Sequence, residues 1–208
     1  MTDTPAAYIV DDDASVRALI AATVRAAGIE PLLFESADQF ASFQMPDRPA
    51  CILLDLEMPG RSGMDLLQRH FTDGCSCPVP IIIVTGHASV PAAVQSMKLG
   101  AVDFLEKPFE RPALLALVQA AIEKDRQRRA AAEVVKEITR RLATLSPRER
   151  ELLGAVIAGK STKMIADELG ISARTVDHHR ANLMEKMAAA NVADLVRMAV
   201  AANFKATA

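Results

Sequence analysis

The sequence predicts an α/β chain: a five-stranded, doubly wound parallel sheet, a long linker helix, and an all-α domain of four helices with a helix-turn-helix. Three observations lead to this fold class. Short apolar runs alternate with helical stretches over the first half, which builds a parallel sheet from βα units. The stretch from Ala113 to Ser146 contains neither glycine nor proline and is rich in good helix formers. The short helical segments after it are each bounded by capping residues.

Five apolar runs predict the strands of the sheet. Cys51–Leu54 and Ile81–Val84 are continuously apolar, as expected of strands that helices cover on both faces, so we expect them to be central. Ser15 and Ser36 are the expected N-caps of the first two helices. The predicted strands are 8–10, 31–34, 51–54, 81–84 and 101–105, and the predicted helices lie near 15–27, 36–44, 63–71, 89–98 and from 111 onward.

The long helix permits two interpretations. Its apolar residues follow one heptad frame that Lys124 and Arg128 interrupt, so it either forms a self-associating coiled coil or packs on its own domains as an amphipathic linker. The interruption favours neither. The heptad residues are Leu114, Leu117, Ala121, Ala131, Val135, Ile138, Leu142 and Leu145.

The last part of the chain predicts four short helices, over 147–158, 162–169, 173–187 and 192–203. Ser146 begins a capping box, with proline at the first helical position and Glu149 at the third. Ser161 and Ser172 are expected to cap the second and third helices, and the connection from Leu169 to Ser172 is typical of the tight turn of a helix-turn-helix.

Charge is divided unevenly along the 208 residues. Residues 1–122 carry 8 basic and 15 acidic side chains, a balance of −7, whereas residues 140–208 carry 11 and 7, a balance of +4. The C-terminal part can therefore approach a polyanion such as DNA, and the N-terminal part repels it. We expect domains over 1–122 and 142–208, joined by a helical linker over 123–141.

Two further observations concern the compartment. No segment approaches the ~20 continuous apolar residues of a membrane span, and no basic segment precedes an apolar run at the N-terminus, so we expect a cytoplasmic protein without membrane contact. Cys51, Cys75 and Cys77 are an odd number, which argues against a disulfide framework. The Cys75/Cys77 pair lacks a second ligand pair, so a metal site there is not favoured.

Acidic residues gather where the predicted strands end. Asp11 and Asp12 follow the first strand directly, and Asp55 follows the third. Ligands of open parallel sheets bind at the carboxyl ends of the strands, so we expect these side chains to lie close together. Carboxylates this close need protons or a cation, and oxygen ligands favour Mg²⁺. Thr85 and Lys107, after the fourth and fifth strands, supply the hydroxyl and cation that phosphoryl chemistry requires.

Each of these residues alone has an ordinary explanation, as a solvated turn, a strand end or a surface charge. In this order and spacing they resemble a receiver domain of the flavodoxin-like fold, over residues 6 to about 120. The motifs are Ile9-Val10-Asp11-Asp12-Asp13, Leu54-Asp55-Leu56-Glu57-Met58-Pro59-Gly60, Val84-Thr85-Gly86-His87 and Glu106-Lys107-Pro108-Phe109.

The resemblance implies that Asp55 is the phosphoacceptor of a sensor histidine kinase. It further implies that Asp12 binds Mg²⁺ directly with help from Asp11, that Asp55 and the Glu57 backbone carbonyl complete the metal site, and that Thr85 and Lys107 hold phosphoryl oxygens. Thr85 and Phe104 are the residues that receivers use as a two-state switch, although Phe104 is equally well explained as plain core. The family also implies a cis Lys107–Pro108 bond.

The C-terminal part resembles a LuxR-type helix-turn-helix over about 142–205, and the whole chain is similar to the FixJ and NarL family, nearer to the FixJ group. The motifs are Leu145-Ser146-Pro147-Arg148-Glu149-Arg150, Lys163-Met164-Ile165-Ala166, Ile171-Ser172-Ala173-Arg174-Thr175-Val176 and Arg180-Ala181-Asn182. In the recognition helix, Ala173–Met187, we expect Val176, Leu183 and Met187 to face the core.

The outward residues are the expected DNA contacts. Lys163 and Arg180 are placed to reach phosphates, with a solvated charge as the alternative. Asp177 can accept a hydrogen bond from the amino group of cytosine, or it excludes other bases. A module this small calls for a dimer on paired half-sites, for which the last helix offers Leu195, Val196, Met198 and Ala199, with core packing as the alternative for half of them. The predicted DNA-binding residues are Lys163, Arg174, Thr175, Asp177, His178, Arg180 and Ala181.

Together these features predict a phosphorylation-gated transcription factor that is not an enzyme. Its expected cofactor is Mg²⁺, and its expected partners are a sensor histidine kinase, double-stranded DNA, RNA polymerase and a second copy on activation. If the receiver masks the DNA-binding domain, deleting residues 1–140 should leave DNA binding intact and independent of a phosphodonor. The alternatives are a phosphate-sink or protein-interaction receiver and an aspartyl-phosphate hydrolase with Glu57 as its acid or base.

Overall fold

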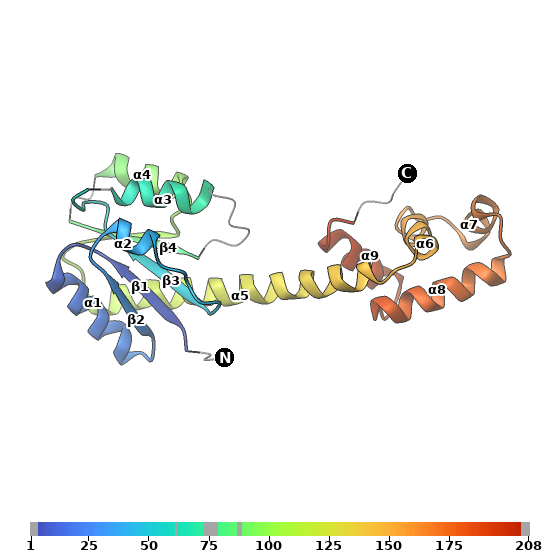
Figure 1. Ribbon diagram of the computed structural model, residues 1–208, viewed down its shortest axis with the longest axis horizontal. Helices are drawn as coiled ribbons and strands as arrows, with labels where there is room; N and C mark the ends of the chain where they lie inside the picture. The colour runs from blue at the N-terminus through green and yellow to red at the C-terminus, as the bar shows by residue number, and fades with distance from the viewer. Residues whose placement is uncertain (1–3, 61, 73–78, 87–88, 205–208) are drawn as a thin grey trace. The chain divides into compact units, whose positions relative to one another are not determined.

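A computed structural model of the chain describes residues 4–60, 62–72, 79–86 and 89–204 (Figure 1). The chain divides into two compact units, Met1–Arg129 and Ala130–Ala208. Cys75, Cys77 and His87 lie outside the described residues. Cys51 is buried in a strand, and this burial raises the pKa of its thiol to about 12. A neutral, inaccessible thiol fits a packing role for Cys51.

The first unit contains the predicted five-stranded parallel sheet, in the order β2-β1-β3-β4-β5. This order reverses direction after β1, which is the doubly wound arrangement. The two predicted central strands, β3 and β4, are buried along their whole length, and so is β1. The strands are β1 Ala6–Val10, β2 Glu30–Phe34, β3 Ala50–Leu54, β4 Ile81–Thr85 and β5 Asp103–Glu106.

Helices cover both faces of this sheet (Figure 1). On one face, Phe40, Leu66 and Leu67 of α2 and α3 join a core with alternate strand residues. On the other face, residues of α1 and α5 such as Val24 and Leu114 pack on the intervening strand residues. The helices are α1 Ala14–Ala26, α2 Ala37–Ala41, α3 Gly63–Thr72, α4 Val90–Lys98 and α5 Arg111–Ala143.

Two local predictions about these helices need correction. Ser15 does not cap α1, because the Asp13 side chain accepts hydrogen bonds from the backbone N–H groups of Ser15 and Val16. Ser36 caps α2 as predicted, but the helix ends at Ala41 rather than near residue 44. Phe43 leaves the helix to pack beside Tyr8, with 5.8 Å between the ring centroids. Burial of this aromatic ring outweighs another turn of helix.

The predicted long helix is continuous as α5, and each half packs within its own unit. Leu114 and Ala121 are buried in the first unit, and Ile138 and Leu142 are buried in the second. These four heptad residues are therefore unavailable for the seam of a coiled coil. Between them, Asp125 is fully buried and accepts a hydrogen bond from the backbone of Ala50 at 3.0 Å.

The second unit adds four helices whose ends follow the predicted capping. Ser146 forms a complete capping box with Glu149, Ser161 and Ser172 cap the next two helices, and Gly170 ends the second in the left-handed conformation with φ of 62°. The helices are α6 Pro147–Ile157, α7 Thr162–Leu169, α8 Ala173–Met187 and α9 Val192–Ala201. Their shared core buries Leu152, Leu153, Ile165, Val176, Leu183, Met187, Leu195 and Ala199.

Glu149 links three segments of this unit. Its carboxylate accepts hydrogen bonds from the Ser146 backbone at 2.8 Å, from the Ser146 hydroxyl at 2.9 Å and from Lys186 Nζ at 2.8 Å. The bond from Lys186 is the main reason that the pKa of Glu149 falls to about 2. Glu149 therefore stays ionised in the folded chain, and its contribution to stability is lost only as the pH falls from about 4.5 towards 2.

Two of the four α9 residues that were expected to contact a partner are buried and cannot do so. Leu195 and Ala199 are buried in the core at 0% and 2% exposure, which removes them from any surface. Val196 and Met198 are half-buried. None of the helices in the described ranges is long and apolar enough to cross a membrane.

Candidate functional site

Three carboxylates meet at the carboxyl edge of the sheet, as the motif order predicts. Val10 and Leu54 are paired in neighbouring strands, so Asp11 and Asp55 emerge side by side, and the Asp55 N–H donates to the Val10 carbonyl at 2.9 Å. One ligand oxygen from each of Asp11, Asp12 and Asp55 lies within 4.8 Å of the others. Asp11 and Asp55 are buried, whereas Asp12 is exposed.

Lys107 connects the two buried carboxylates. Its Nζ donates to Asp11 Oδ2 and to Asp55 Oδ2, each at 2.6 Å. Burial by itself lowers the pKa of Lys107, but the bonds to the two carboxylates outweigh it and raise that pKa above its ordinary value. The lysine is therefore a permanent cation in the site. Burial raises the pKa of Asp11, against the opposing bonds from Lys107 and the Asp13 backbone.

Backbone donors orient the remaining oxygens. The Asp13 N–H binds Asp11 Oδ1 at 2.9 Å, and the Glu57 N–H binds Asp55 Oδ1 at 3.0 Å. These bonds hold both side chains in one rotamer. The Glu57 side chain is exposed and its backbone is tied to Asp55, so its carbonyl group, the predicted ligand, belongs to a fixed turn.

The donor set of this site fits a magnesium ion. Three carboxylates face a single ammonium group, which leaves an excess of negative charge for a divalent cation to balance. All three offer oxygen, and Mg²⁺ binds one or two carboxylates while it keeps several waters. The exposed position of Asp12 leaves an open side from which the ion and a phosphoryl donor can approach.

A second surface lies on α8, in the other unit. Arg174, Asp177, His178 and Ala181 form one exposed stripe, at spacings of three, one and three residues, as predicted. Val176, Leu183 and Met187, on the opposite side, are 0% exposed, which confirms the predicted inward face. The other predicted DNA contacts are Lys163, exposed on α7, and Thr175 and Arg180, half-buried on α8.

Comparison with known proteins decides the family. Residues 7–119 match the response regulator receiver domain, and residues 143–199 match the luxR family of bacterial regulatory proteins. The chain belongs to the response regulators. It is 43% identical over 195 residues to the transcriptional regulatory protein FixJ of Bradyrhizobium diazoefficiens, and the match covers 94% of each chain. FixJ of Rhizobium meliloti is 43% identical over 197 residues, which cover 95% of this chain and 96% of that one.

Solved structures of response regulators agree. The structure of the response regulator StyR has a TM-score of 0.81 and 37% identity, with 95% of this chain and 98% of that chain covered. Full-length FixJ from B. japonicum has a TM-score of 0.54 and 41% identity, covering 96% and 98%. The chain is thus a two-component response regulator, a phosphorylation-controlled regulator of transcription with a kinase partner and a DNA-binding domain, and not an enzyme.

Receiver domains bind Mg²⁺ at an acidic pocket, and the cluster of Asp11, Asp12 and Asp55 is this receiver's acidic pocket. Thr85 ends β4 beside it and is fully buried. Ile83 of β4 pairs with Phe104 of β5, and both side chains belong to the core on one face of the sheet. Because side chains alternate along a strand, Thr85 points to the same face as Ile83. The half-buried Phe104 ring therefore shares a face with Thr85. The predicted cis Lys107–Pro108 bond is present.

Two residues that support the response regulator's site escaped the sequence interpretation. Arg17 of α1 donates to the backbone carbonyl of Asp11 at 2.6 Å. Gly63 begins α3 directly against the backbone of Asp55, where a Cβ would lie 2.0 Å from the Asp55 carbonyl oxygen. Glycine has no advantage in helix propensity at the first position of a helix. Its presence there was the one local signal that the backbone of α3 must approach the backbone of Asp55 closely.

We expect Gly63→Ala to damage both stability and phosphorylation, because the backbone of residues 55 and 56 must move to admit the methyl group. A clash with backbone in a packed region costs about 1–3 kcal/mol. Urea unfolding measures the loss, and the rate of labelling by acetyl phosphate measures the displacement of Asp55. Asp65→Ala is the matched control, since Asp65 is exposed on the same helix. Equal labelling rates in the two variants would exclude a positioning role for Gly63.

Proposed function

We propose that Asp55 is the phosphoacceptor of this response regulator. The supporting observation is the bridge of Lys107 between Asp11 and Asp55, at 2.6 Å to each, in a buried pocket with a surplus of carboxylates. An Asp55 oxygen bonds to phosphorus while the phosphorus–nitrogen bond of the kinase's phosphohistidine breaks and that nitrogen takes up a proton. Lys107 then exchanges its bond to Asp55 for one to a phosphoryl oxygen and keeps its bond to Asp11.

In this proposal Asp11, Asp12, Asp55 and the Glu57 carbonyl hold Mg²⁺. The ion, when bound, supplies charge neutralisation at the equatorial phosphoryl oxygens. The Thr85 hydroxyl donates to a phosphoryl oxygen, and Phe104 fills the space that Thr85 leaves. That rearrangement is a packing switch between two side chains. Thr85 and Phe104 lie on the same face of the sheet, which is the geometry that such a switch requires.

Metal removal tests the phosphoacceptor proposal. After treatment with acetyl phosphate and Mg²⁺, intact mass spectrometry should detect one adduct of about 80 Da, the mass of a phosphoryl group. The same treatment in excess EDTA should give little or no adduct, because the carboxylates then repel the donor. An adduct of equal yield in EDTA would overturn the metal assignment, and no adduct in Mg²⁺ would overturn the phosphoacceptor.

We further propose that α8 reads the major groove, with Arg174, Thr175, Asp177, His178 and Ala181 towards the bases and Lys163 and Arg180 towards phosphates. The regulator pairs as a homodimer on two half-sites and contacts RNA polymerase there. Because bacterial DNA lies in the cytoplasm, the chain acts in that compartment. A luxR-type domain in the same chain favours this function over a phosphate-sink or interaction receiver.

Two substitutions on α8 separate base reading from phosphate contact. Asp177→Asn should change which base pair is preferred at one position of the operator, by about 1–3 kcal/mol for a good base contact. Arg180→Ala should instead weaken binding to all sequences and reduce the salt slope of log K by about 1. Binding to a randomised duplex library at several salt concentrations measures both. An unchanged preference in Asp177→Asn would remove Asp177 from the groove.

A further inference from the structure

Asp12 differs from the other two carboxylates of the acidic pocket in the way it is held. Asp11 and Asp55 are buried and each accepts a hydrogen bond from Lys107. Asp12 is exposed, and within the described part of the chain its carboxylate has no hydrogen bond and no ion pair. One of its oxygens nevertheless lies within 4.8 Å of the ligand oxygens of the other two. The position of the Asp12 side chain is therefore set by the backbone on either side of it.

Both peptide groups that flank Asp12 are fixed by hydrogen bonds. On the N-terminal side, the carbonyl oxygen of Asp11 accepts a bond from Arg17 Nη1 at 2.6 Å. On the C-terminal side, the N–H of Asp13 donates to Asp11 Oδ1 at 2.9 Å. Because each peptide group is planar, a bond to its carbonyl or its N–H fixes the orientation of the whole group. The two bonds together thus restrict φ and ψ of Asp12 and the direction in which its side chain leaves the backbone.

Arg17 is itself attached to this loop through the first turn of α1. The Asp13 carboxylate accepts hydrogen bonds from the N–H groups of Ser15 and Val16, at 2.7 and 3.3 Å. The N–H of Arg17 donates to the Asp13 carbonyl at 3.0 Å. The half-buried Arg17 side chain then returns to the end of β1 and closes a ring of contacts around Asp12.

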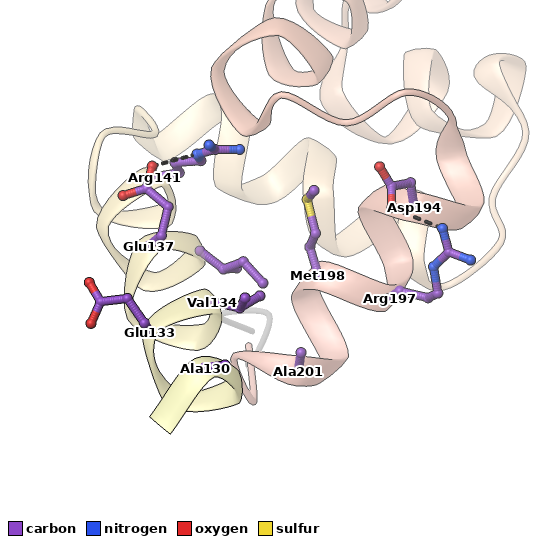
Figure 2. Close-up of a pocket in the computed structure, with 10 residues that line it drawn as sticks. Ala130, Glu133, Val134, Glu137, Arg141, Asp194, Arg197, Met198 and Ala201 are labelled. Atoms are coloured by element: carbon purple, nitrogen blue, oxygen red, sulfur yellow. Dashed lines mark hydrogen bonds and ion pairs between the residues drawn. The ribbon is translucent and has the colours of Figure 1, made fainter. Parts of the chain in front are cut away.

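Several helical arginines of this chain pair with a carboxylate one turn away, but Arg17 does not. Two such pairs lie around an open groove between α5 and α9 in the second unit (Figure 2). They join Arg141 to Glu137 at 2.8 Å and Arg197 to Asp194 at 2.9 Å. Arg17 has no ion pair within the described ranges, although two exposed aspartates lie in the adjacent loop. Its guanidinium therefore binds the backbone of the loop and not a neighbouring carboxylate.

We propose that Arg17 is a positioning residue for the cation of the acidic pocket. Through the Asp11 carbonyl it holds Asp12 in place as a ligand, and in this way it sets the affinity of the pocket for Mg²⁺. Without this bond the Asp12 backbone must become ordered at the moment of binding, and the lost conformational freedom weakens binding. This inference rests on the proposed magnesium site and names the residue that preorganises it.

Electrostatics alone would give the opposite result. The guanidinium has the same sign as Mg²⁺, so removal of its charge by itself should strengthen the binding of the ion. Arg17→Met removes the charge and the hydrogen-bond donor, keeps most of the aliphatic stem, and leaves the backbone bond to Asp13 intact. The direction of the change in affinity thus distinguishes positioning from a simple effect of charge.

Isothermal titration of the full-length chain with MgCl₂, without a phosphodonor, measures this affinity. Arg17→Met should bind Mg²⁺ about 10- to 100-fold more weakly than wild type, the usual effect of removing a group that orients a metal ligand. Arg17→Lys should bind more tightly than Arg17→Met, because its ammonium group can still donate to the carbonyl. Arg25→Met removes an exposed charge from the last turn of the same helix and should bind like wild type. Unchanged or tighter binding in Arg17→Met, or equal weakening in Arg25→Met, would overturn the proposal.

Labelling by acetyl phosphate at increasing MgCl₂ separates positioning from damage to the fold. In Arg17→Met the Mg²⁺ concentration at half-maximal labelling should rise by the same factor as the dissociation constant. The maximal rate should stay close to that of wild type, since coordination then holds Asp12. A lower maximal rate and melting temperature with an unchanged midpoint would mean a purely structural role and would refute the assignment.

The titration also separates this inference from the function on which it rests. A wild-type chain that binds no Mg²⁺ counts against the proposed metal site. A wild-type chain that binds Mg²⁺ no more tightly than Arg17→Met counts against the role of Arg17 alone.

Discussion

Asp55→Asn should bind DNA equally well with and without acetyl phosphate, whereas the wild-type chain should bind about 5- to 150-fold more tightly after phosphorylation, the usual range of coupling between two sites. The amide has nearly the shape of the carboxylate, and its single oxygen keeps one of the two hydrogen bonds that the carboxylate oxygens accept from Lys107 and the Glu57 backbone, so the fold should persist. The amide is not a nucleophile at phosphorus, and the substitution removes one of the charges that would hold the proposed cation.

A mobility shift on genomic fragments, with acetyl phosphate and Mg²⁺ present or absent, measures this response. Asp65→Asn, an exposed carboxylate on α3, is the control that should respond like wild type. If Asp55→Asn retains the full response, another residue accepts the phosphoryl group and the proposed mechanism is wrong.

The acidic site was predictable because its residues follow strands directly. Once Val10 and Leu54 are recognised as the ends of parallel neighbours, sheet geometry alone brings Asp11 next to Asp55. The same holds for α8, where helical periodicity separates the buried Val176 and Leu183 from the exposed Arg174 and Asp177. In both places the position of the functional residues follows from the local sequence pattern together with one general rule, which is the pairing of parallel strands for the acidic site and the burial of one helix face for α8.

The features that escaped prediction depend on contacts between distant parts of the chain. Asp125 of α5 binds the Ala50 backbone, 75 residues away, and is surrounded by Arg128 and Arg129. In the sequence these three residues look like a solvated charge run. The approach of Gly63 to the Asp55 carbonyl is likewise set by the packing of α3 on the sheet. Periodicity carries no information about either contact.

The position at which the DNA-binding unit begins should have a large effect on its stability and its DNA binding. A chain reduced to residues 130–208 should bind DNA without any response to acetyl phosphate, because it keeps the whole core of the second unit and lacks Asp55. We expect the cut that the sequence suggested, after residue 140, to destabilise the DNA-binding unit. It removes Ile138, which is 6% exposed in the same core as Leu142 and Leu153.

Loss of a buried isoleucine side chain costs about 2–5 kcal/mol. A small domain has a total stability of only about 5–15 kcal/mol. Residues 141–208 should therefore melt at a markedly lower temperature than residues 130–208 and bind DNA weakly for that reason alone. Thermal unfolding by circular dichroism, beside a mobility shift of both fragments, distinguishes the cases. Equal melting temperatures would show that the last turns of α5 contribute nothing to this core. A stable 130–208 fragment with no affinity for DNA would mean that the receiver contributes to DNA binding and does not simply mask it.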